Sequence, residues 1–280
     1  MIFDVHSHAW QYPRHFSDDF REQARRARAN QEVDLSVSHT DYRHAAPAEV
    51  KTIVFGGKAR RSGLWVDDQY VSDYVAQAPD GLVGFLSVDP TQDGWERELI
   101  TGHEELGLRG IKLLPMYAGF MPQDDSLSRL WQYATDHQLP VLLHTGTTFI
   151  SQAPIEYTLP RHLDTVAMRH PECKIVMAHL GHPYEGECVA IIRKHPNVYA
   201  DISALYYRPF QLYQSLMLVQ EYGVWNKLLF GTDYPFTTVN GTIDGLRGLN
   251  NMLAGTQLPR LDEAQIEAMI YRDSFSLLGL

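Results

Sequence analysis

Five side chains that can bind a metal ion or transfer a proton stand at the downstream ends of apolar runs. They are His6 and His8 in IFDVHSH, His144 in VLLHTG, His179 in KIVMAHLGHP and Asp233 in KLLFGTDYPF. Imidazole nitrogens and carboxylate oxygens are ligands of zinc, iron and manganese in proteins. Because these runs are spread over the whole chain, a common site needs a fold that gathers the ends of four strands.

The spacing of the first two histidines would allow both to bind the same metal ion. Successive side chains of a strand alternate between its two faces, so His6 and His8 project on the same side. A His-x-His pair also occurs by chance, and a lone histidine at a strand end is usually an ordinary polar residue. The metal site is therefore predicted from all four strand ends together, as an open catalytic site rather than a closed structural one.

Short β-rich runs alternate with longer helical segments along the chain. Their apolar middles lack strict alternation, as expected of parallel strands that are covered on both faces. The predicted strands cover residues 2–6, 52–57, 82–88, 110–115, 140–146, 174–181, 198–203 and 227–233. The predicted helices cover residues 17–30, 67–79, 93–107, 125–138, 159–171, 184–196, 209–223, 239–255 and 262–277.

This alternation predicts a (β/α)8 TIM barrel that forms a single domain over residues 1–280. Three helices end near His137, His170 and His195, which we interpret as helix-end residues and not as ligands. A doubly wound open sheet is the alternative, but no glycine-rich phosphate loop follows any strand. In a barrel, functional residues gather at the carboxyl ends of the strands, where the five candidate side chains stand.

The composition of the chain excludes some classes of binding partner. The formal charge of −10 argues against a binder of nucleic acid, because such proteins depend on clustered Lys and Arg. No apolar run approaches the roughly 18 residues that a membrane helix needs, and no secretory signal pattern opens the chain. The only two cysteines, Cys173 and Cys188, have no disulfide-type or zinc-type spacing. We expect a cytoplasmic protein that acts on a small molecule.

The combination of DVHSH, the strand-end His144, AHLG and FGTDYPF resembles the amidohydrolase superfamily. The similarity is to its amidohydrolase-related branch, which includes aminocarboxymuconate semialdehyde decarboxylase, and it covers nearly the whole chain. This resemblance implies one divalent metal surrounded by His6, His8, His144 and Asp233. It implies that His179 is a proton-transfer group or an additional ligand. Relatives in the branch are often dimers, so a homodimer is expected.

A metal in this setting would be catalytic. A divalent cation lowers the pKa of bound water toward about 7 and makes hydroxide available at neutral pH. Zinc is the expected metal, with manganese or iron as alternatives. Asp233 can bind the metal, orient the water or accept its proton, and the sequence does not separate these roles. His179 has the side-chain chemistry of a proton shuttle.

Lys112 in GIKLLP has three interpretations. It is a cation for a substrate carboxylate, a structural ion-pair partner, or a modified lysine that bridges two metals, as in binuclear members of the superfamily. Asp4 lies deeper on the strand face of His6 and is expected to support the site. The other candidate substrate-binding residues are Tyr117, Arg161, His182 and Arg208. The long connections at 31–50, 56–67 and 116–125 are candidate walls of the site.

Two reactions fit these residues equally well by spacing. The first is metal-dependent hydrolysis of a lactone, ester or amide in a small acidic or ring-containing metabolite. The alternative is non-oxidative decarboxylation of a small carboxylated substrate. Some decarboxylating relatives carry Glu in place of the first histidine of the pair, whereas this chain has His6, which favours hydrolysis. A barrel used only for binding would be expected to lack a key residue, and none is missing.

Overall fold

The computed structural model describes residues 1–27, 34–47 and 49–280. Within these residues, eight parallel strands form one sheet in the order β1-β2-β5-β6-β7-β8-β9-β10. The strands are β1 (Ile2–His8), β2 (Val50–Phe55), β5 (Leu82–Ser87), β6 (Ile111–Leu113), β7 (Val141–Leu143), β8 (Ile175–Met177), β9 (Val198–Asp201) and β10 (Leu228–Leu229). A short antiparallel pair, β3 (Lys58–Ala59) and β4 (Leu64–Trp65), lies outside this sheet.

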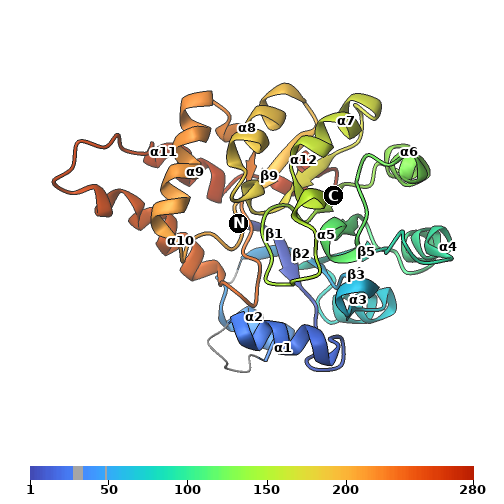
Figure 1. Cartoon of the computed structure of the whole chain (residues 1–280). Coiled ribbons are helices and arrows are strands. Elements are labelled where there is room, and N and C mark those ends of the chain that lie inside the picture. The colour runs from blue at the N-terminus through green and yellow to red at the C-terminus, as the bar shows by residue number, and fades with distance from the viewer. Residues whose placement is uncertain (28–33, 48) are drawn as a thin grey trace.

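The first and last strands of the sheet are joined by backbone hydrogen bonds. The N–H of Val5 donates to the carbonyl of Phe230 over 3.0 Å, and the N–H of Asp233 donates to the carbonyl of His6 over 2.7 Å. An isolated parallel bridge between Ser7 and Tyr234 continues this contact. The sheet therefore curls into a (β/α)8 TIM barrel, as expected, and the helices surround it (Figure 1).

The helices alternate with the barrel strands as the sequence indicates. They are α1 (Asp18–Ala27), α2 (His39–His44), α3 (Asp68–Val75), α4 (Trp95–Ile100), α5 (Pro115–Ala118), α6 (Ser128–Asp136), α7 (Arg161–Arg169), α8 (Glu185–Lys194), α9 (Pro209–Tyr222), α10 (Val239–Gly248), α11 (Glu263–Ile270) and α12 (Ser274–Leu278). The segment 262–277, predicted as one helix, is two helices. Asp273 caps the N-terminus of the second helix, because its side chain accepts a hydrogen bond from the N–H of Ser276.

The long connections contain short elements that the hydrophobic pattern did not predict. Helix α2 falls within 31–50, the pair β3 and β4 lies within 56–67, and α5 overlaps the start of 116–125. Residues 28–33 and 48 lie outside the described residues, and the predicted first helix and first connection each extend into them. None of the helices in the described ranges combines the length and apolar character that a bilayer-spanning helix needs.

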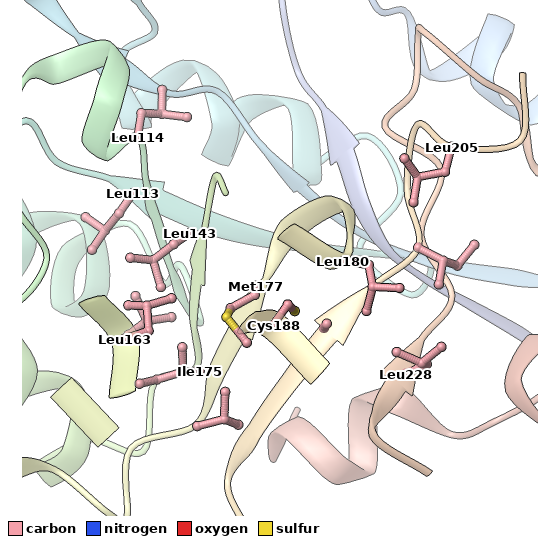
Figure 2. Close-up of a cluster of buried hydrophobic side chains, with 14 of the residues drawn as sticks. Leu113, Leu114, Leu143, Leu163, Ile175, Met177, Leu180, Cys188, Leu205 and Leu228 are labelled. Carbon is pink, nitrogen blue, oxygen red and sulfur yellow. The ribbon is translucent and has the colours of Figure 1, made fainter. Parts of the chain in front are cut away.

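Alternate side chains of a barrel strand belong to an apolar cluster inside the barrel and to one between the strands and the helices. On β7, Val141 and Leu143 belong to the cluster between strands and helices, whereas Leu142 belongs to the cluster inside the barrel. Figure 2 shows part of the outer cluster, which includes Met177 of β8 and Cys188 of α8. The same alternation on β6 places Ile111 and Leu113 in the outer cluster. Lys112 therefore faces the barrel interior.

Candidate active site

The five candidate side chains meet at the carboxyl end of the barrel. His6 and His8 are part of β1, whereas His144, His179 and Asp233 follow β7, β8 and β10. The predicted strands were too long at these ends, because the chain leaves the sheet before the functional side chain. His179 has a φ of 58° and Asp233 a φ of 64°. Such left-handed backbone is costly for residues other than glycine and is concentrated at functional sites.

Asp233 contacts both histidines of β1. Its Oδ1 lies 2.9 Å from Nε2 of His8 and 3.1 Å from Nε2 of His6. Burial favours the neutral carboxyl, but the hydrogen bonds from the two imidazoles outweigh it and hold the pKa of Asp233 well below its usual range. Burial lowers the pKa of His8 to about 3. At neutral pH, a carboxylate thus faces the neutral ring of His8.

Asp201, which was not among the predicted site residues, binds the ring nitrogen of His6 that faces away from Asp233. Its Oδ2 accepts a hydrogen bond of 2.9 Å from Nδ1 of His6, and its Oδ1 accepts one of 2.9 Å from the backbone N–H of His179. Asp201 ends β9 and is fully buried. A carboxylate that holds one ring nitrogen of a histidine directs the other toward the site. The sequence signal that could have identified Asp201 was an acidic residue within VYADIS, the seventh predicted strand.

His179 is held by the segment that follows Asp201. Its Nδ1 lies 2.8 Å from Oγ of Ser203 and 3.2 Å from the carbonyl oxygen of Ser203. If Nδ1 carries the proton and donates to this carbonyl, Nε2 is the nitrogen left for the site. Burial lowers the pKa of His179 to about 4, so its ring is neutral at pH 7.

A group of ligand atoms suited to a metal lies among these side chains. One atom each from His6, His179 and Asp233 lies within 4.8 Å of the other two. His8 reaches the same carboxylate oxygen, and its Nδ1 is buried with no hydrogen-bond partner in the described residues. Imidazole nitrogens with one carboxylate oxygen form a donor set that fits zinc, manganese or iron in an open site. The donor chemistry therefore fits one divalent ion.

His144 lies next to this group in a different arrangement. Its ring centroid is 5.2 Å from that of His179 and 4.9 Å from that of Tyr117. Its Nε2 lies 3.1 Å from the carbonyl oxygen of Thr147, so Nδ1 is the nitrogen left without a hydrogen bond to any of the described residues. The structure brings His144 to the site but does not gather its nitrogen with the other ligand atoms. Its role as a ligand stays a prediction.

Asp4 holds the backbone next to the site by hydrogen bonds, in line with the expected supporting role. It is fully buried and accepts hydrogen bonds from the backbone N–H groups of His6 and Thr232, over 3.1 and 3.0 Å. It also accepts one of 3.0 Å from the hydroxyl of Tyr42, which belongs to α2. Burial raises the pKa of Asp4 to about 6. Asp4 thus links β1, the segment after β10 and one of the long connections.

The site consists of two cavities. The inner cavity has a volume of about 70 Å³, and its walls include His6, His8, Lys112, His144, His179 and Asp233. The outer cavity has a volume of about 420 Å³, and its walls include Tyr117, His144, His179, His182, Arg208 and Asp233. Both cavities share Tyr117, His144, His179 and Asp233. The inner cavity has room for a small group, and the outer one for a small metabolite.

The predicted substrate-binding residues separate into two groups. Lys112, Tyr117, His182 and Arg208 line the cavities. Arg161 does not line either cavity, because its side chain is exposed and forms an ion pair with Glu187. The structure therefore does not bring Arg161 to the site, and its substrate-binding role stays a prediction without geometric support.

His182 in the outer cavity is oriented by a carboxylate. Its Nδ1 lies 2.6 Å from Oε1 of Glu185, which also accepts a hydrogen bond of 2.9 Å from the hydroxyl of Ser215. Gly146 makes room for this arrangement, because a Cβ at that position would lie 2.0 Å from the carbonyl oxygen of His182. His182 is therefore a polar side chain held in position in the cavity wall.

Comparisons with known proteins agree with this architecture. A search of the curated proteins finds no match. The structure is similar to an uncharacterised TIM-barrel protein from Bordetella bronchiseptica, with a TM-score of 0.69 and 19% identity over 99% of this chain and 98% of that one. It is similar to a probable 2-pyrone-4,6-dicarboxylic acid hydrolase from Acinetobacter baumannii with citric acid bound, with a TM-score of 0.68 and 16% identity over 100% and 99%.

A decarboxylase shares the same fold. A 5-carboxyvanillate decarboxylase from Novosphingobium aromaticivorans, with bound manganese and 3-methoxy-4-hydroxy-5-nitrobenzoic acid, matches with a TM-score of 0.65 and 13% identity over 100% of this chain and 97% of that one. At this level of identity, these structures show the fold alone. A family model for amidohydrolases matches residues 3–272, which include every candidate ligand and, apart from Ile2, all residues of the eight barrel strands described above. The chain therefore belongs to the amidohydrolase family.

Proposed function

We propose that this chain is a metal-dependent hydrolase that opens a lactone, ester or amide bond in a small acidic or ring-containing metabolite. The observation that carries the proposal is the convergence of His6, His8, His179 and Asp233 on one inner cavity that adjoins a larger one. A buried carboxylate among imidazoles, next to space for a metabolite, is suited to acyl-transfer chemistry with water.

The residues that would hold the metal are His6, His8 and Asp233, with His144 as the further predicted ligand. Zinc is the metal that we expect, with manganese or iron as alternatives. When bound, the metal supplies Lewis acidity, which lowers the pKa of water and polarises a carbonyl group. Asp201 accepts the hydrogen bond of Nδ1 of His6, so Nε2, which faces Asp233, is the nitrogen that would bind the metal.

Asp233 and His179 have the properties of proton-transfer groups. Asp233 stays ionised at neutral pH because its pKa is held low by His6 and His8 despite burial, so it can accept a hydrogen bond from an attacking water. His179 is neutral at pH 7 and is held at Nδ1 by Ser203. Its Nε2 can therefore take up a proton and return it to the leaving group.

The charge of the cavity walls supports an acidic substrate. The basic side chain of Lys112 lines the inner cavity and that of Arg208 lines the outer one. Two structural neighbours carry a carboxylic acid, namely citric acid and a nitrobenzoic acid derivative. Aromatic side chains, among them Tyr117 and Phe149, line both cavities and would contact a ring.

The test is turnover of two substrate panels by the purified protein. One panel contains lactones and esters of small carboxylic acids, and the other contains carboxylated aromatic acids. Product analysis by mass spectrometry and a carbon dioxide detector distinguish the outcomes. The proposal expects addition of one water to a lactone or ester without carbon dioxide. Release of carbon dioxide from the second panel, with no hydrolysis in the first, would replace the hydrolase by the decarboxylase alternative.

A further inference from the structure

Lys112 has an unusual environment for a charged side chain. It is almost completely buried and faces the interior of the barrel from β6. Its Nζ lies 4.3 Å from the centroid of the Phe55 ring. Among the described residues, no carboxylate lies within ion-pair distance of this nitrogen, although the fields of Asp201 and Asp233 reach it. The structural ion pair that the sequence left open is therefore not formed.

Another buried lysine of the chain shows what a structural ion pair looks like here. Nζ of Lys58 lies 2.8 Å from Oδ2 of Asp68 and 2.8 Å from Oε2 of Glu98. These carboxylates outweigh the effect of burial, and the pKa of Lys58 is raised. Burial instead lowers the pKa of Lys112 to about 8, and Asp201 and Asp233 oppose this shift only in part. The fold thus provides two carboxylates for one buried lysine and none for the other.

An unpaired buried ammonium group costs free energy in the free protein. A protein keeps such a group where a ligand supplies the missing partner, because sites that bind charged ligands are often destabilised before binding. Lys112 lies in the inner cavity, and the only acidic side chain in the walls of that cavity, within the described residues, is Asp233. Asp233 is already engaged by His6 and His8. An incoming anion is the remaining partner.

We propose that Lys112 binds an anionic group of the substrate, a carboxylate, in the inner cavity. This inference rests on the proposed function and deepens it, because it assigns the substrate class and the end of the substrate that enters first. The carboxylate would enter from the outer cavity and accept a charge-assisted hydrogen bond from Nζ. The uncharged remainder of the substrate would then lie against Tyr117 and Phe149, which line both cavities.

The experiment compares benzoate with benzamide, two probes of nearly equal shape that differ in charge. Binding is measured by titration calorimetry at pH 7 with protein as purified, together with the melting temperature of the free protein and its metal content. The variants are Lys112→Met and Lys112→Gln, which remove the charge. The matched control is Lys194→Met, which removes one positive charge from the surface of α8, where Lys194 pairs with Asp164.

The proposal expects the wild type and Lys194→Met to bind benzoate at least tenfold more tightly than benzamide. Both Lys112 variants should lose this preference. The melting temperature of free Lys112→Met should equal or exceed that of the wild type, because an unpaired buried charge has been removed. Benzoate should raise the melting temperature of the wild type and have a much smaller effect on Lys112→Met.

Three results would overturn the proposal. The first is a preference for benzoate that persists in both Lys112 variants, or is absent from the wild type. The second is a melting temperature of free Lys112→Met several degrees below that of the wild type, which would indicate a structural role. The third is a loss of metal from both Lys112 variants, which would make Lys112 a metal-binding group. Because binding is measured without turnover, failure of the hydrolase assay alone would leave this assignment standing.

Discussion

His6 and Asp201 form a fully buried hydrogen bond, in which Nδ1 of His6 lies 2.9 Å from Oδ2 of Asp201. The two residues come from β1 and β9, which are not neighbours in the sheet. The contact fixes the ring of His6 so that its Nε2 lies 3.1 Å from Oδ1 of Asp233. The end of a fifth strand, β9, therefore positions a predicted ligand, although β9 itself contributes none of the predicted ligands.

Replacing Asp201 with Asn should weaken metal binding without unfolding the protein. The variant keeps the shape of the side chain but removes the charge that holds the His6 tautomer. Loss of such a supporting carboxylate typically lowers metal affinity by about 10-fold to 100-fold. Competition with a chromophoric chelator measures the affinity. Asp164→Asn is the matched control, because Asp164 also pairs with a histidine, His195, but remote from the cavities. Equal affinities in both variants would contradict the role of Asp201.

His144 and His179 should respond differently to substitution. If His144 is a ligand and His179 transfers a proton, His144→Ala should reduce the bound metal, whereas His179→Asn should retain it and lose turnover. A general acid or base typically contributes about 10²-fold to 10⁴-fold to the rate. Metal content and kcat are measured on the same preparations. The reverse pattern, with metal lost from His179→Asn and retained in His144→Ala, would assign His179 as the ligand, as its position near His6 and Asp233 allows.

Acid should destabilise the metal-free protein through His179. Burial lowers its pKa to about 4, whereas an unfolded chain has a histidine pKa near 6.5. Between these two values, the unfolded chain binds a proton at this position and the folded chain does not, so stability falls as the pH falls. The expected contribution is about 2 kcal/mol between pH 7 and pH 5.

The comparison with His179→Gln isolates this contribution from other titrating groups. Urea unfolding in the presence of a chelator, at pH 7 and at pH 5, gives the free energy of unfolding for both proteins. The wild type should lose more stability than His179→Gln on acidification, by about the same 2 kcal/mol. An identical loss in both proteins would show that His179 does not carry the acid sensitivity.

Glu185→Gln should impair substrate binding while leaving the metal in place. The carboxylate of Glu185 holds His182 in the wall of the outer cavity through a contact of 2.6 Å. Loss of one such hydrogen bond is worth about 1.4 kcal/mol, or about tenfold in affinity. A positioning role predicts a higher KM, a smaller change in kcat and unchanged metal content. A fall in kcat at constant KM would instead place His182 at the reacting atoms.

The sequence predicted the barrel because short apolar runs alternate regularly with longer helical segments. All eight predicted strands are present, and most predicted helices differ by a few residues at their ends. The errors have physical causes. The strands after which His144, His179 and Asp233 stand end early, because the chain adopts left-handed backbone at His179 and Asp233, which no hydrophobic pattern reports. The small elements in the connections depend on tertiary contacts, such as the hydrogen bond of Tyr42 to Asp4.

The site was predicted in part for a related reason. Histidines and carboxylates at strand ends are visible in a sequence, and the structure brings His6, His8, His144, His179 and Asp233 to the same cavities. Asp201 carried a weaker signal, because it is one acidic residue without a spacing motif. Whether Lys112 has a partner, and whether Arg161 points toward the cavities, depends on neighbours distant in sequence. For these two residues, the local sequence pattern does not predict the surroundings of the side chain.

Metal analysis of the wild type beside His6→Ala and Asp233→Ala tests the central claim most directly. Each variant removes one of the side chains whose ligand atoms gather in the inner cavity. Purified wild-type protein, reconstituted with zinc or manganese where needed, should contain about one divalent ion per chain, as expected for a single catalytic site. Both variants should contain much less and lose turnover in parallel. Wild-type protein that stays free of metal after reconstitution with zinc and with manganese would contradict the account.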